Sequence, residues 1–191
     1  DIIIPNGYYG SILHKSTLDK LSTFVSSGGT LSAIGNALNS FVDKKGYSLK
    51  SKESKKDSTK YNLIPYADQE RNNIKNMITG AIFKSKVDVT HPLAFGYKSD
   101  YFSLKLSGTS YNYLKKGVNV AYFDKETKNV SGFAGSRTLN NIPESLLFGE
   151  DRKGSGSIIY MVDNPLFRSF WENGKLFLAN AVFLLNSDII K

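Results

Sequence analysis

Cysteine is absent from this chain of 191 residues, and histidine occurs only at positions 14 and 91. The lack of cysteine excludes catalysis by a thiol, zinc ligation by thiolates, and disulfide bonds. A catalytic zinc ion generally needs three protein ligands, and neither His14 nor His91 stands in a His-x-x-Glu or His-Glu-x-x-His pattern. We therefore expect no cofactor and no metal site within this chain.

Long apolar segments are missing too. No apolar run approaches the ~20 residues that a membrane-spanning helix needs, and residues 1–5 lack the basic start of a signal peptide. Residues 2–4 instead have the pattern of a strand already under way, which predicts that the chain is a piece of a longer protein. Its composition, with 40% hydrophobic and 22% charged residues, is that of a globular protein. We expect residues 1–191 to form a single domain.

The motifs of serine hydrolases and of phosphate-binding loops are also absent. An α/β hydrolase carries Gly-x-Ser-x-Gly at a turn from strand to helix, and no such pentapeptide occurs. The glycine-rich run 154–157 lacks the Gly-Lys-Ser/Thr ending that holds a phosphate, and it is typical of a hairpin turn or a loop. Paired carboxylates for glycoside hydrolysis have no diagnostic spacing, so the sequence leaves that chemistry open.

The chain has an excess of positive charge, with 25 Lys and Arg against 17 Asp and Glu and a formal net charge of +8. Much of this excess lies in residues 44–60, where lysines are mixed with Glu53, Asp57 and several serines. That composition favours a solvated loop over a groove that follows phosphates, because it lacks regular aromatic interleaving. A basic nucleic-acid-binding module is the less favoured alternative, and we expect no nucleic-acid partner.

The first 36 residues have the pattern of a strand, a helix and a second strand. Residues 2–4 are a short β-branched run, expected to be buried on both faces, and residues 5–7 form a turn. Apolar residues then recur at helical spacing from position 18 to position 25, until two glycines end the helix. Residues 31–34 predict the next strand. A right-handed βαβ unit places Gly35 and Asn36 at the carboxyl edge of a parallel sheet.

The rest of the chain predicts further elements in less regular order. Helices are expected from about 36 to before 46, from 68 to about 77, and over 176–185, and extended segments at 81–83 and 87–89. The clearest later strands are 101–106, 118–123 and 158–162. Glycines between 132 and 156 predict a loop-rich region. Residues 163–171 are expected to form a turn that packs three aromatic side chains over the end of the sheet, with a ligand site as the alternative.

Four segments together resemble a class I glutamine amidotransferase-like domain. They are 2–7 (Ile-Ile-Ile-Pro-Asn-Gly), 28–36 (Gly-Gly-Thr-Leu-Ser-Ala-Ile-Gly-Asn), 91–97 (His-Pro-Leu-Ala-Phe-Gly-Tyr), and 163–165 (Asp-Asn-Pro) with 180–183 (Asn-Ala-Val-Phe). More closely, the chain is similar to the version of this domain at the C-terminus of large bacterial zinc carboxypeptidases of the carboxypeptidase A type. The resemblance implies an α/β, flavodoxin-like three-layer sandwich with a mostly parallel sheet. It also implies that the N-terminal βα unit usual in this fold is absent.

The resemblance implies that the catalytic groups of active amidotransferases are missing. In those enzymes the turn after the second strand carries a cysteine, and a later strand ends in His-Pro-Glu, whose histidine activates the thiol. Here Asn36, or its neighbour Gly35, stands at the first place, and Asp163-Asn164-Pro165 stands at the second. An amide or a glycine does not replace a thiolate, so we expect this chain not to be an enzyme.

The carboxypeptidase resemblance implies that zinc and peptide hydrolysis belong to an upstream domain. This chain would then be an accessory domain that contacts its own upstream peptidase domain, and that binds a peptide or a small molecule. Such parent proteins are usually exported, which predicts a periplasmic or extracellular location. We expect the binding site at the carboxyl edge of the sheet, formed by Asn36, His91 and Arg168. The alternative is a cryptic hydrolase that uses serine or acidic residues at the same edge.

Overall fold

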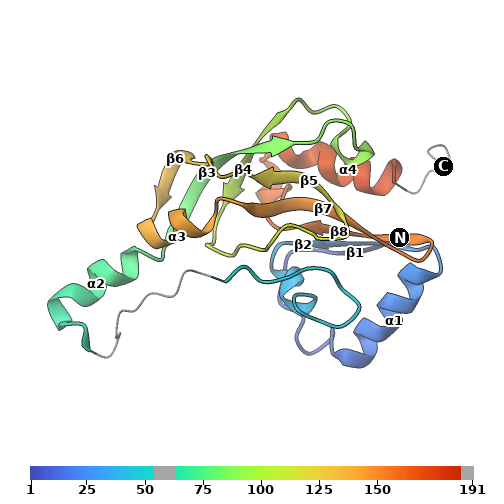
Figure 1. The fold of residues 1–191 in the computed structure, drawn as a ribbon, viewed down its shortest axis with the longest axis horizontal. Coiled ribbons are helices and arrows are strands. Elements are labelled where there is room, and N and C mark those ends of the chain that lie inside the picture. Colours follow the sequence, from blue (N-terminus) through green and yellow to red (C-terminus); the bar gives the residue numbers. More distant parts are fainter. Residues whose placement is uncertain (54–62, 186–191) are drawn as a thin grey trace.

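The computed structural model describes residues 1–53 and 63–185, and it contains one sheet with helices on both sides (Figure 1). The strands are β1 (Ile2–Ile4), β2 (Thr30–Ile34), β3 (Ile78–Val87), β4 (Asp100–Lys105), β5 (Val118–Phe123), β6 (Asn129–Ala134), β7 (Ser145–Lys153) and β8 (Gly156–Met161). The α-helices are α1 (Lys15–Ser26), α2 (Tyr66–Ile74), α3 (Ser136–Asn141) and α4 (Lys175–Phe183). Short 3-10 helices are η1 (Gly35–Ser40), η3 (Pro92–Ala94), η4 (Phe167–Ser169) and η5 (Glu172–Gly174).

The sheet has the strand order β1-β2-β8-β7-β5-β3-β4, and β6 pairs with β3 beside this path. Strands β1, β2 and β8 run parallel, and every pairing beyond β8 is antiparallel. The α/β class is confirmed, as is the βαβ unit made by β1, α1 and β2. The expectation of a mostly parallel sheet holds only for this part. The remaining strands pair antiparallel, as in the hairpin that joins β7 to β8.

Two hydrophobic cores lie on the two faces of the sheet, which makes the architecture a three-layer sandwich. Helix α1 covers one face with Leu18, Leu21 and Val25, whose spacing puts them on one side of the helix. Helix α4 covers the other face and buries Phe177 and Ala181 (Figure 1). The β2 strand is buried over its whole length because it lies between the two cores.

Some expectations about local structure are corrected. Strand β1 lies at the edge of the sheet and leaves Ile3 43% exposed, so it is not buried on both faces. The helix expected after Asn36 is only the 3-10 helix η1. Residues 54–60 of the lysine-rich segment lie outside the described residues.

The region expected to be rich in loops contains strands β6 and β7. Its glycines mark places where two backbones come close, and that need is compatible with a strand. A Cβ atom at Gly149, for example, would lie 2.8 Å from the carbonyl oxygen of Val118 on the neighbouring strand. The turn at Gly154 and Ser155 is confirmed as a hairpin between β7 and β8, with Gly154 at φ 59°.

Candidate ligand site at the carboxyl edge of the sheet

The turn after β2 is built around Gly35. This residue has φ 58°, in the left-handed region that favours glycine. A Cβ atom here would also overlap the side chain of Asn6, which follows the parallel neighbour β1. The Oδ1 atom of Asn6 accepts a hydrogen bond of 2.9 Å from the backbone N–H of Asn36. The two parallel strands are therefore tied together where they end, and the turn has no room for a side chain at position 35.

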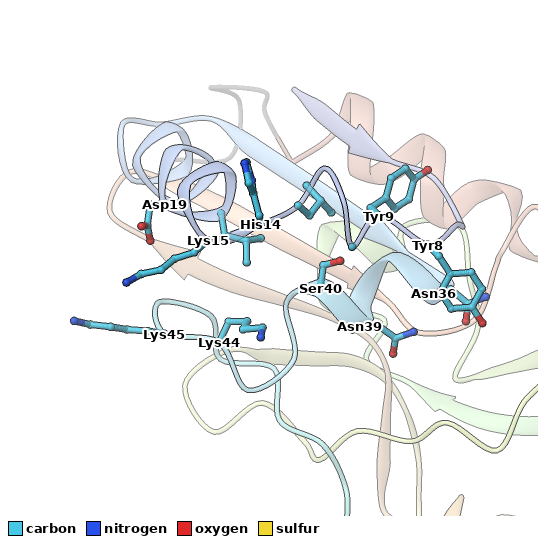
Figure 2. Close-up of a pocket in the computed structure, with 13 residues that line it drawn as sticks. Tyr8, Tyr9, His14, Lys15, Asp19, Asn36, Asn39, Ser40, Lys44 and Lys45 are labelled. Carbon is cyan, nitrogen blue, oxygen red and sulfur yellow. The ribbon is translucent and has the colours of Figure 1, made fainter.

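A cavity of about 600 Å³ opens beside this turn (Figure 2). Its walls are the loop after β1, the first turn of α1, the helix η1 and the loop that follows η1. The lining residues are Tyr8, Tyr9, Gly10, Leu13, His14, Lys15, Leu18, Asp19, Asn36, Asn39, Ser40, Lys44 and Lys45. The volume is within the range of small-molecule sites, and the position at the carboxyl ends of parallel strands is where α/β proteins bind ligands.

A buried ion pair lies at the end of β8. Asp163 follows this strand by two residues, and its Oδ1 atom is 3.0 Å from the ammonium group of Lys105 on β4. The other carboxylate oxygen accepts a hydrogen bond of 2.6 Å from the hydroxyl group of Ser103. Only 1% of the Lys105 side chain and 10% of the Asp163 side chain are exposed. Both carboxylate oxygens of Asp163 are thus engaged within the protein.

Tyr111 lies between the ion pair and the cavity. Its hydroxyl group donates a hydrogen bond of 3.3 Å to Oδ1 of Asn39, a cavity residue on η1. Burial, together with the negative charge of Asp163, raises the pKa of Tyr111 to about 12. The phenol therefore stays protonated at neutral pH and acts as a donor that fixes Asn39.

Two of the three residues expected at the carboxyl edge lie on its side of the sheet, but only one lines the cavity. Asn36 is a lining residue and is partly exposed. Arg168 follows β8 and is exposed, with its guanidinium group 5.2 Å from the ring centre of Phe167. It is not among the lining residues, and its φ of 49° is unusual for a residue other than glycine. The expected turn at 163–171 is present, although Phe170 is 58% exposed and does not pack over the sheet.

The expectation that His91 joins this site is wrong. His91 follows β3, which runs antiparallel to β5, so the end of β3 lies near the start of β5. The Nε2 atom of His91 is 2.7 Å from Oε2 of Glu150, and Glu150 pairs with Val118, the first residue of β5. The hydroxyl group of Ser157, near the start of β8, also donates to Glu150. His91 therefore lies toward the amino ends of the strands, away from Asn36.

Glu150 is the centre of that second polar cluster. Burial would raise the pKa of its carboxyl group, but hydrogen bonds from His91 and Ser157 outweigh burial and hold the pKa below its usual range. The Nδ1 atom of His91 accepts a hydrogen bond of 3.2 Å from the backbone N–H of Leu93, which leaves Nε2–H to donate to Glu150. His91 caps the start of η3, and none of the three residues of this cluster lines the cavity.

Sequence reasoning missed most of the residues that line the cavity. Tyr8, Tyr9 and Lys15 lie in or next to the loop after β1, and Lys44 and Lys45 were assigned only to a solvated run. The sequence could have indicated these residues by their place in the loops after β1 and β2, since loops that follow two adjacent parallel strands meet at one edge of the sheet. The Lys105 and Asp163 pair left no such signal, because these residues are 58 positions apart in sequence.

No group of three or more histidine, aspartate or glutamate residues in the described ranges could hold a metal ion. Across the same ranges, none of the helices has the length and apolar character to cross a membrane.

Comparison of the sequence with protein-family models and with curated proteins finds no match. Comparison of the structure finds a ThuA-like protein from Parabacteroides merdae at TM-score 0.53 and 13% identity, which covers 94% of this chain and 68% of that one. A ThuA-like protein from Bacteroides uniformis has TM-score 0.48 and 13% identity, with 94% and 66% covered. A β-galactosidase from Bacillus circulans has TM-score 0.46 and 10% identity, and this chain spans 21% of its length.

At these identities the likeness concerns the fold alone. The match to the Parabacteroides merdae protein covers 94% of this chain, including both the parallel and the antiparallel part of the sheet. The chain has a flavodoxin-like, class I glutamine amidotransferase-like α/β fold, similar to the fold of the ThuA-like protein from Parabacteroides merdae.

Proposed function

We propose that this chain is a non-catalytic binding domain that holds a ligand in the cavity at the carboxyl edge of its sheet. The observation that carries the proposal is the turn after β2, where this fold places its nucleophile. The strained position of that turn is Gly35, which has φ 58° and no space for a side chain. A cavity of ligand size remains beside the turn, so a binding site is retained where the reacting group is lost.

The position that the catalytic histidine occupies in active amidotransferases supports the same proposal. Active amidotransferases carry a histidine after the strand that corresponds to β8, and here Asp163 follows that strand. Its carboxylate is held by Lys105 and Ser103, with both oxygens in hydrogen bonds. Asp163 therefore fits a structural role better than proton transfer.

We further propose that the domain belongs to a larger zinc carboxypeptidase, as the resemblance of segments 2–7, 28–36, 91–97, and 163–165 with 180–183 implies. The zinc ligands and the peptidase activity then lie in an upstream domain, which is the first partner of this one. An exported parent would place the domain in the periplasm or outside the cell. The gene sequence before Asp1 tests this directly, since it should encode a His-x-x-Glu segment and a more distant histidine.

Assays of the purified chain test the non-catalytic part. We expect no turnover of glutamine, of a p-nitrophenyl ester or of a peptide, with Asn36→Ala indistinguishable from the natural sequence. Ligand binding at the cavity should be detectable by chemical-shift changes at Asn36 and Asn39. Turnover that Asn36→Ala abolishes would overturn the proposal.

A hydrolase that uses Ser40 is the second candidate, because the hydroxyl group of this serine lines the cavity. Within residues 1–53 and 63–185, however, no hydrogen bond joins Ser40 to a histidine or a carboxylate that could activate it. Esterase activity that survives chelators and disappears in Ser40→Ala would favour this candidate. The matched control is Ser11→Ala, which changes an exposed serine outside the lining.

A further inference from the structure

The cavity has a positively charged end. Lys15, Lys44 and Lys45 line it together with the first turn of α1, and Asp19 is the one carboxylate in the lining (Figure 2). None of these three ammonium groups forms an ion pair with another described residue. The N-terminus of α1 adds partial positive charge, because its first backbone N–H groups have no side-chain cap. Three cations and one anion around one space favour a negatively charged occupant.

The loop that carries Lys44 and Lys45 is held in place by its neighbours. Asp43 begins the loop at φ 57°, and its carboxylate accepts a hydrogen bond of 2.6 Å from Ser51. Tyr47 closes the loop by packing its ring at 5.0 Å from Phe41 and donating a 2.7 Å hydrogen bond to Leu18 O. The two lysines therefore extend from a backbone that is already ordered, so less entropy is lost when an anion binds.

The other end of the cavity is polar and uncharged. Asn36, Asn39 and Tyr8 lie there, with Ser40 between the two ends (Figure 2). Because the Tyr111 hydroxyl group donates to Oδ1 of Asn39, the NH₂ group of Asn39 is left to donate to a ligand. Tyr8 is 80% exposed at the rim and offers an aromatic face. Amides, a hydroxyl group and a phenol ring match a ligand body that has hydroxyl groups and a flat apolar side.

We propose that the cavity binds an anionic carbohydrate, a sugar acid or a sugar phosphate, with its charged group between Lys15, Lys44 and Lys45 and its hydroxyl groups toward Asn36 and Asn39. The volume of about 600 Å³ accommodates a monosaccharide or disaccharide of this kind. This inference rests on the proposed function, in which the cavity is a ligand site, and it adds the chemical class of the ligand.

Isothermal titration of the full chain with matched monosaccharides tests the inference. Glucose 6-phosphate and glucuronate carry a phosphate and a carboxylate group on the same sugar. Glucose has no charged group, and glucosamine carries a positive charge instead. Inorganic phosphate has the anionic group without the sugar ring. We expect at least one of the two acids to bind roughly tenfold tighter than glucose, since hydrogen bonds to charged groups are the stronger kind. The acid that binds tighter identifies the anionic group. Added salt should weaken this binding.

Variants at the charged end and at the polar end of the cavity test which part of the ligand each end binds. Lys44→Gln with Lys45→Gln should lower the affinity for the acid roughly tenfold and leave that for glucose unchanged. Asn39→Ala should lower the affinity for the acid and for glucose together. The control is Lys115→Gln with Lys116→Gln, an exposed pair outside the cavity, which should change neither.

The possible failures are distinguishable. Glucose binding as tightly as both acids, or phosphate binding as tightly as glucose 6-phosphate, would overturn the inference and leave the cavity as a ligand site. No binding of either acid at millimolar concentration would also overturn it. A screen of small molecules of every charge that finds no ligand at Asn36 or Asn39 would remove the proposed function as well.

Discussion

The ammonium group of Lys105 and the carboxylate of Asp163 form an ion pair of 3.0 Å across the interior of the molecule. The pair joins β4 to the segment after β8, although four strand pairings separate β4 from β8 in the sheet. Lys105 also lies 5.5 Å from the ring centre of Phe123. The sheet therefore curls so that its antiparallel end closes over the carboxyl end of β8, next to the cavity.

Asp163→Asn should destabilise the fold by about 3 kcal/mol, because it leaves the buried Lys105 ammonium group without a counter-charge. The amide is similar in size to the carboxylate and still accepts a hydrogen bond from Ser103, so packing is little changed. The free energy of unfolding from urea denaturation, followed by circular dichroism, measures the loss. Adding Lys105→Met to Asp163→Asn should restore part of the stability. If the double variant lost the sum of the free energies lost by Asp163→Asn and Lys105→Met alone, the two charges would not be coupled.

Gly35→Ala should cost about 1–3 kcal/mol, because alanine is strained at φ 58° and its Cβ atom would overlap the side chain of Asn6. Gly10→Ala is the matched control: Gly10 also lines the cavity, but a Cβ atom there would have no heavy atom within 4 Å. We expect Gly10→Ala to change the thermal midpoint by little. Equal effects of the two substitutions would contradict the special role of Gly35.

The sequence predicts the βαβ unit well because its signals are local. The helical spacing of Leu18, Leu21 and Val25, and the glycines that end the helix, need no information from the rest of the chain. Parallel pairing of β1 with β2 then follows from the helix between them, which is long enough for a crossover connection. Gly35 and Asn36 were placed at the correct edge for the same reason.

The antiparallel part could not be predicted in this way, since its pairings join segments that are far apart in the chain. His91 illustrates the consequence. It was expected at the carboxyl edge of the sheet, and the antiparallel direction of β3 puts it beside Glu150 instead. The direction of β3 depends on its pairing with β5 and β4, which no local pattern records.

The Glu150 cluster predicts a dependence of stability on pH. The folded-state pKa of Glu150 lies below its ordinary value of 4.5, so the carboxylate contributes stability above that pH and loses it as the pH falls through the folded-state pKa. Glu150→Gln should therefore be less stable than the natural sequence at pH 7, and the difference should shrink below about pH 4.5. Urea midpoints measured from pH 7 downward test this.

Glu126→Gln serves as the reference for that series, because Glu126 is exposed on the loop between β5 and β6. Its urea midpoints should follow those of the natural sequence at every pH. A difference between Glu150→Gln and the natural sequence that stays constant down to the lowest pH would mean that the ionised carboxylate is not the source of the stability.

Substitution of Asn180 should also lower the stability of the fold. This residue links two of the segments that resemble a class I glutamine amidotransferase-like domain. Its side-chain NH₂ group donates hydrogen bonds of 2.9 Å to Leu93 O and 2.8 Å to Phe95 O, so it fastens α4 to the segment 91–97. Asn180 is 5% exposed, and Asn180→Ala would leave both carbonyl oxygens without these donors, at about 2–3 kcal/mol. Asn180→Asp should cost more, since a carboxylate repels them. Asn140→Ala, at an exposed site in α3, should be nearly neutral by the same urea measurement, and an equal loss there would contradict the role of Asn180.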